Sequence, residues 1–121
     1  MTRRTIIVLA TAAATLGVVF SQAVKTQRFP QLENADVKVW KSVVVPNAPL
    51  EMHRHEHGRV IVAIQGGTMR IKEKDGKTED HVWETGKAYW LPANAPGTMH
   101  ADVNVGTKPI EVMVVEMKKD R

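Results

Sequence analysis

Three histidines lie at every second position of one short segment, at His53, His55 and His57. Successive side chains of a β-strand point to opposite faces, so alternate residues share one face. Three imidazoles on one face are costly in an apolar core, whereas neutral imidazole is a good ligand for first-row metals. A fourth histidine, His100, follows a Pro-Gly pair far along the chain. These residues and their spacing indicate a metal site assembled from separate segments.

Short strand-like segments separated by turn residues must position these histidines. From residue 37 onwards, apolar and β-branched runs alternate with Gly, Pro, Asn and Asp. We expect strands at residues 37–45, 50–57, 59–65, 68–74, 77–83, 87–91, 98–104 and 110–117. Strands about ten residues apart, without a long amphipathic helix, are typical of an all-β sandwich or barrel. We therefore predict an all-β jelly-roll barrel, in which ligands from distant strands can meet.

Two segments carry spaced motifs. In the first, His53 and His55 form an HxH pair, and Arg59 and Gly66 follow it. The second contains spaced glycines, a proline, a histidine and an asparagine: Gly86, Pro92, Gly97, His100 and Asn104. The two motifs, in this order, resemble those of small single-domain, RmlC-like cupins. The resemblance covers roughly residues 37–117, and two motifs together are far more specific than one.

The resemblance implies a cupin-type double-stranded β-helix with a metal inside. The implied ligands are His53, His55 and His100, and the implied cofactor is a divalent first-row metal such as iron, manganese, zinc or nickel. By the same resemblance, the protein would act on a small carboxylate or polar metabolite as a dioxygenase, isomerase or lyase, and would form a homodimer. Arg59 stands where the family has a metal-binding glutamate, so the protein ligand set is one short. No catalytic residue can be assigned.

Three further residues are candidates for the rim of the site or for substrate binding: His57, Arg59 and Tyr89. Arg59 cannot ligate a metal, because its guanidinium stays protonated and has no free lone pair. It shares strand parity with His55, so it can point inward and bind either a substrate carboxylate or an internal acidic side chain. The internal candidates are Glu51, Glu111 and Glu116. We expect His57 at the rim, although it can also replace a missing ligand.

Because Arg59 occupies the position of the family's metal-binding glutamate, two classes of function stay open. The first is a metal-binding cupin that acts on a small carboxylate or polar metabolite. The second is a non-catalytic, metal-free protein that binds or senses a small molecule. A metal with an open coordination position favours the first class, whereas an inward Arg59 paired with a carboxylate favours the second.

The N-terminal segment has the pattern of an export signal. Two arginines are followed by an uncharged, largely apolar run over residues 5–20 and then by Ser21-Gln22-Ala23. The run is shorter than the ~20 residues that a membrane-spanning helix needs. We therefore predict a signal peptide at residues 1–23, a periplasmic or secreted protein, and no stable membrane span after processing. General secretory and twin-arginine export both fit. An N-terminal arm at residues 24–36 would then precede a cupin domain at residues 37–117.

Composition limits the remaining classes of function. The chain of 121 residues has the length of one domain and contains no cysteine, which excludes disulfides, a lipid-modified cysteine and a thiol nucleophile. The net charge of +4 falls by two when the two arginines of residues 1–23 are removed. Basic residues do not form a stripe with interleaved aromatics, so we expect no nucleic-acid partner. The expected partners are a small-molecule ligand and a second copy of the chain.

Overall fold

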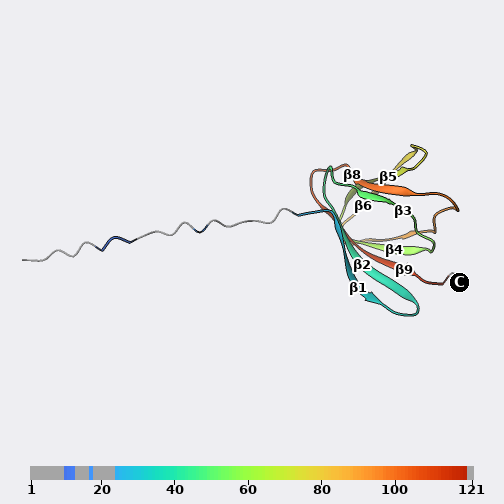
Figure 1. Cartoon of the computed structure of the whole chain (residues 1–121), viewed down its shortest axis with the longest axis horizontal. Coiled ribbons are helices and arrows are strands. Elements are labelled where there is room, and N and C mark those ends of the chain that lie inside the picture. Colours follow the sequence, from blue (N-terminus) through green and yellow to red (C-terminus); the bar gives the residue numbers. More distant parts are fainter. Residues whose placement is uncertain (1–9, 13–16, 18–23, 120–121) are drawn as a thin grey trace, which may run out of the picture.

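The structure, a computed structural model, describes residues 10–12, 17 and 24–119. Its strands form two β-sheets (Figure 1). The strands are β1 (Gln27–Glu33), β2 (Val37–Val44), β3 (Leu50–His53), β4 (Arg59–Gln65), β5 (Gly67–Glu73), β6 (Thr78–Trp83), β7 (Ala88–Leu91), β8 (His100–Asn104) and β9 (Ile110–Met117). The signal peptide predicted at residues 1–23 lies almost entirely outside the described residues. Within the described residues, no helix has the length and apolar character to cross a membrane.

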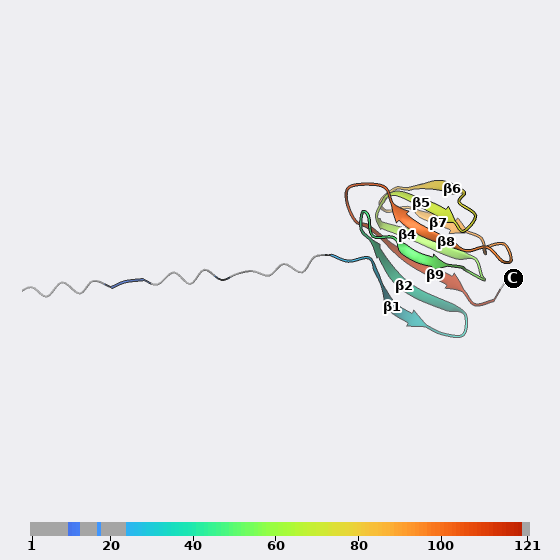
Figure 2. The same cartoon turned by 45° about the horizontal axis from the view of Figure 1, so that its top comes forward.

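The five-stranded sheet has the order β1-β2-β9-β4-β7, and the four-stranded sheet has the order β3-β8-β5-β6. In both views, β1 and β2 of the first sheet lie on one side of the domain, and β5 and β6 of the second sheet lie on the other side (Figures 1 and 2). Their facing side chains form one apolar cluster, with Trp40, Ile61 and Val114 from the first sheet and Met69 and Trp83 from the second. The predicted all-β jelly-roll fold is confirmed.

The first strand, β1, lies in the segment predicted as an N-terminal arm. It pairs with β2 in antiparallel fashion, with a register shift between Pro30 and Leu32. Its side chains are almost all exposed, so its sequence lacks the alternation that marks a half-buried strand. Backbone pairing at the edge of the sheet, where proline is tolerated, is what makes this segment a strand. The pairing also places the guanidinium of Arg28 5.2 Å from the ring centroid of Trp40.

The strand predicted at residues 50–57 ends earlier, at His53. The chain then leaves the four-stranded sheet and enters the five-stranded sheet at Arg59, where β4 begins. His55 and His57 therefore lie in the segment that crosses between the sheets. Strand alternation therefore does not determine where their side chains point. The prediction that His55 and His57 share a strand face with His53 was wrong.

The tightly packed core gives a direct test of the fold. Ile110 is only 1% exposed, and a Cβ atom added to Gly67 would lie 2.8 Å from its Cγ1 atom. Ile110→Ala should lower the free energy of unfolding by about 2–5 kcal/mol, because it removes buried methyl groups and leaves a cavity. The matched variant Val82→Ala, on a strand residue that is 66% exposed, should change it by less than about 0.5 kcal/mol. Urea unfolding measures both, and equal losses would contradict this packing.

Candidate metal centre

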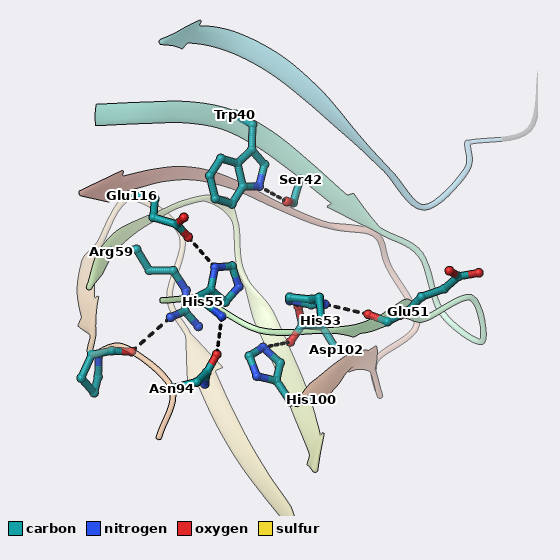
Figure 3. Close-up of polar contacts among 11 residues, drawn as sticks. Trp40, Ser42, Glu51, His53, His55, Arg59, Asn94, His100, Asp102 and Glu116 are labelled. Atoms are coloured by element: carbon teal, nitrogen blue, oxygen red, sulfur yellow. Dashed lines mark hydrogen bonds and ion pairs between the residues drawn. The ribbon is translucent and has the colours of Figure 1, made fainter. Parts of the chain in front are cut away.

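Three histidines from separate segments gather between the sheets (Figure 3). His53 ends β3, His100 begins β8, and these two residues pair across the strands. His55 comes from the segment that crosses to β4. One nitrogen from each imidazole can be chosen so that all three lie within 4.8 Å of one another. The structure thus brings together the three predicted ligands.

Two of the rings are oriented by hydrogen bonds from their Nδ1 atoms. His53 Nδ1 lies 2.6 Å from the backbone oxygen of Glu51, and His55 Nδ1 lies 2.5 Å from Oε2 of Glu116. Both partners are acceptors, so the proton sits on Nδ1 and the Nε2 lone pair is free to bind a metal. The backbone N–H of His55 also donates to Asn94 Oδ1 at 2.6 Å. These contacts hold the crossing segment in place without a strand.

The Nε2 atoms of His53 and His100 are buried, and neither has a hydrogen-bond partner within the described part of the chain. Buried polar atoms without partners are rare in proteins, and each costs about 1–3 kcal/mol. A metal ion would satisfy both nitrogens at once. The residues present therefore fit a divalent first-row ion, with imidazole ligands that suit iron, manganese, nickel or zinc.

The surroundings keep these imidazoles neutral, which is the form that ligates a metal. Burial lowers the pKa of His53, more strongly than the backbone oxygen of Glu51 raises it. Burial also lowers the pKa of His100 to about 3, and the positive charges of neighbouring side chains add to this effect. Both rings can accept a metal without first losing a proton at neutral pH.

Arg59 points inward, as predicted, and is only 6% exposed. Its Nη1 atom donates to the backbone oxygen of Pro92 at 3.2 Å. Burial lowers the pKa of Arg59, while the carboxylates of Asp102 and Glu116 work in the opposite direction. Arg59 is therefore a buried cation beside two acidic groups. Of the internal partners considered from the sequence, Glu116 is the one directly opposite it in the register of β4 and β9.

His57 and Tyr89 lie outside the three-histidine cluster. Burial raises the pKa of Glu116, but the hydrogen bond from His55 and nearby positive charges, including His57, outweigh it and lower the pKa. His57 thus adds to the electrostatic environment of the carboxylate that orients His55. The Tyr89 hydroxyl accepts a hydrogen bond from the backbone N–H of Glu84 at 2.9 Å, which is a structural contact. Roles for both residues at the rim stay predictions.

The sequence analysis missed two features of the site: the contact of Glu116 with His55, and the position of Asp102. Glu116 was considered only as a partner for Arg59, whereas it also orients His55. Asp102 was not considered, although it lies two residues after His100 on β8 and shares its face. The alternation that indicated His53 and His55 would have found Asp102 if it had been applied to the second histidine segment.

Two further motif residues, Asn104 and Gly66, serve the fold around the site. Asn104 Nδ2 donates to the backbone oxygens of Val44 and Lys108, at 2.8 and 2.7 Å. A Cβ atom added to Gly66 would lie 2.1 Å from the carbonyl oxygen of Trp83, so only glycine allows this close approach of two backbones. Asn104 therefore ties the end of β8 to the end of β2 and to the loop before β9, and Gly66 lets the chain turn from β4 into β5.

The cluster is reached from two sides. A cavity of about 500 Å³ borders His55 and Glu116 and is also lined by Arg28 and Arg54. Trp40 also lines this cavity, and its ring stacks on that of His55 with the two ring centroids 6.2 Å apart. A second cavity, of about 210 Å³, borders His100 and Arg59. Small molecules therefore have room beside the histidines.

Comparison with known proteins supports the same fold. No protein-family model matches this chain, and no curated protein matches it. Among solved structures, a cupin domain from Bordetella pertussis Tohama I has a TM-score of 0.68 at 21% identity, covering 82% of this chain and 99% of that chain. An RmlC-like cupin family protein with a double-stranded β-helix fold, from Methanocaldococcus jannaschii, has a TM-score of 0.60 at 16% identity, covering 81% and 85%. This chain therefore has the cupin-type double-stranded β-helix fold, with three grouped histidines inside it.

Proposed function

We propose that this protein is a small cupin that binds one divalent first-row metal through His53, His55 and His100. The observation that carries the proposal is the pair of buried, unpartnered Nε2 atoms on His53 and His100. The hydrogen bonds of His53 to Glu51 and of His55 to Glu116 support it, because oriented imidazoles of this kind are typical of metal sites.

A small carboxylate or polar metabolite is the proposed ligand. Arg28 and Arg54 line the cavity that borders His55, and arginine binds carboxylates through two parallel hydrogen bonds. Arg59 already donates to Pro92 and lies beside internal carboxylates, so Arg28 and Arg54 are better placed to receive a carboxylate in that cavity. The bound ligand would lie beside His55, against the ring of Trp40.

The proposed reaction is of the dioxygenase, isomerase or lyase type. When bound, a first-row metal supplies Lewis-acid or redox chemistry at a position open to the substrate. The chain's own contributions are to hold His53 and His100 neutral, to orient His55 through Glu116, and to enclose the ligand against Trp40.

A second function is favoured by one observation, the burial of Arg59 near Asp102 and Glu116. This cation balances part of the internal negative charge without any metal. A non-catalytic, metal-free protein that binds or senses a small carboxylate is therefore the alternative.

Thermal unfolding of chelator-treated protein separates the two functions. An ion that binds only the folded state raises Tm, and the stabilisation reaches about 2.7 kcal/mol when its concentration is 100 times Kd. We expect manganese, iron, nickel or zinc to raise Tm, and a small carboxylate to raise it further when metal is present. A Tm that responds to carboxylates alone would favour the metal-free alternative.

Export and assembly belong to the same proposal. We propose cleavage after Ala23, with the mature domain acting outside the cytoplasm as a homodimer. Intact-mass measurement of the protein from its native host tests the cleavage, and light scattering tests the dimer. A mature protein that retains Met1, or a monomer at working concentrations, would contradict the respective part.

A further inference from the structure

The Asp102 carboxylate faces both of the unpartnered histidine nitrogens (Figure 3). Its Oδ2 atom lies 3.5 Å from Nε2 of His53, and its Oδ1 atom lies 3.6 Å from Nε2 of His100. Asp102 and His100 alternate on β8 and therefore present their side chains to the same interior face. One carboxylate thus spans the two nitrogens that the fold leaves without partners.

These distances suit ligands of one ion better than they suit hydrogen bonds. Hydrogen bonds from nitrogen to oxygen are about 2.7–3.2 Å long, so both contacts are too long to satisfy the nitrogens. Ligands held about 2.0–2.2 Å from one ion are separated by about 3.0–3.5 Å in octahedral or tetrahedral geometry. The distance from the carboxylate to each of the two imidazole nitrogens is therefore already close to the spacing between ligands of one shared metal.

The burial of Asp102 points the same way. Its side chain is only 15% exposed, and a carboxylate withdrawn from water is stable only with a cation or several hydrogen bonds nearby. Neutral His53 and His100 cannot supply that charge, and the single charge of Arg59 is shared between Asp102 and Glu116. A divalent ion between the three groups would supply the charge and would also occupy both free nitrogens.

We infer that Asp102 is a fourth protein ligand of the metal, in place of the glutamate whose position Arg59 occupies. The inference rests on the proposed three-histidine site. The carboxylate comes from β8, beside His100, instead of from β4. The site then consists of an HxH pair from one segment and an HxD pair, His100 and Asp102, from another.

Cobalt(II) titrated into the metal-stripped full chain tests the inference, with both the dissociation constant and the visible absorption spectrum recorded. Asp102→Asn should weaken cobalt binding by about 100-fold and change the spectrum, because an anionic oxygen leaves the ligand set. The matched control is Glu116→Gln, which removes a carboxylate that orients a ligand without binding the metal. It should weaken binding by about 10-fold and preserve the shape of the spectrum. Asp102→Glu, which keeps a carboxylate, should recover part of the affinity if the asparagine variant fails to fold.

The possible failures can be told apart. If the unmutated chain binds cobalt and Asp102→Asn binds it with the same affinity and spectrum, Asp102 is not a ligand while the three-histidine site stands. If Asp102→Asn and Glu116→Gln weaken binding equally with unchanged spectra, Asp102 acts only through its charge and the inference is overturned. If the folded, unmutated chain binds no cobalt, manganese or zinc, both the proposed function and this inference fail.

Discussion

Replacing His100 with alanine should remove nearly all bound metal. His100 is 4% exposed, and its Nε2 atom has no hydrogen-bond partner among the described residues. Loss of a group that only hydrogen-bonds to a metal ligand already costs about 10–100-fold in metal affinity. The His100 variant loses one of the three imidazole ligands themselves, so we expect its metal affinity to fall by more than about 100-fold. Metal per chain after dialysis measures the effect.

His57→Ala is the matched control for this experiment. His57 follows His55 by two residues in the same crossing segment, but it is not one of the three histidines whose ligand atoms gather. We expect the control to retain most of its metal. Equal retention by the His100 and His57 variants would show that the metal does not bind at the gathered imidazoles.

Replacing Arg59 with methionine should have two opposite effects. Without metal, Asp102 and Glu116 lose a neighbouring positive charge, so the free energy of unfolding should fall by about 3 kcal/mol. With metal, the ion no longer faces a buried cation, so binding should become at least about tenfold tighter, which corresponds to about 1.4 kcal/mol. The metal should therefore raise Tm more in the variant than in the unmutated protein.

Arg70→Met is the matched control, because Arg70 forms an exposed ion pair with Asp80 between the paired strands β5 and β6. Exposed pairs contribute little, so its stability and metal affinity should stay close to those of the unmutated protein. If Arg59→Met weakened metal binding, Arg59 would be supporting the site and not opposing the ion.

The sequence predicted the fold because the strands that form the core have apolar positions at regular spacing. It missed β1 because that edge strand buries almost no side chains; only pairing with β2 reveals it. It also extended β3 through His57, because a run of alternating histidines looks the same in a strand and in a segment that crosses between sheets. The crossing becomes visible only when β3 and β4 are assigned to different sheets.

The predicted ligands were found from the two motifs, while their supporting groups depend on contacts between distant segments. Glu116 reaches His55 from a strand 61 residues further along the chain, and no local pattern indicates that contact. Asp102 was within reach of the alternation argument, since it shares a strand face with His100. The motif position of the family glutamate is on β4, where this chain has Arg59, whereas the Asp102 carboxylate enters from β8.

Elemental analysis of the purified protein after dialysis tests the central claim most directly. The unmutated chain, supplied in turn with manganese, iron, nickel and zinc, should retain close to one ion per chain with at least one of them. The two buried, unpartnered nitrogens of His53 and His100 are the reason for this expectation. A folded protein that retains none of these ions would contradict the claim and would leave the metal-free binding protein as the better account.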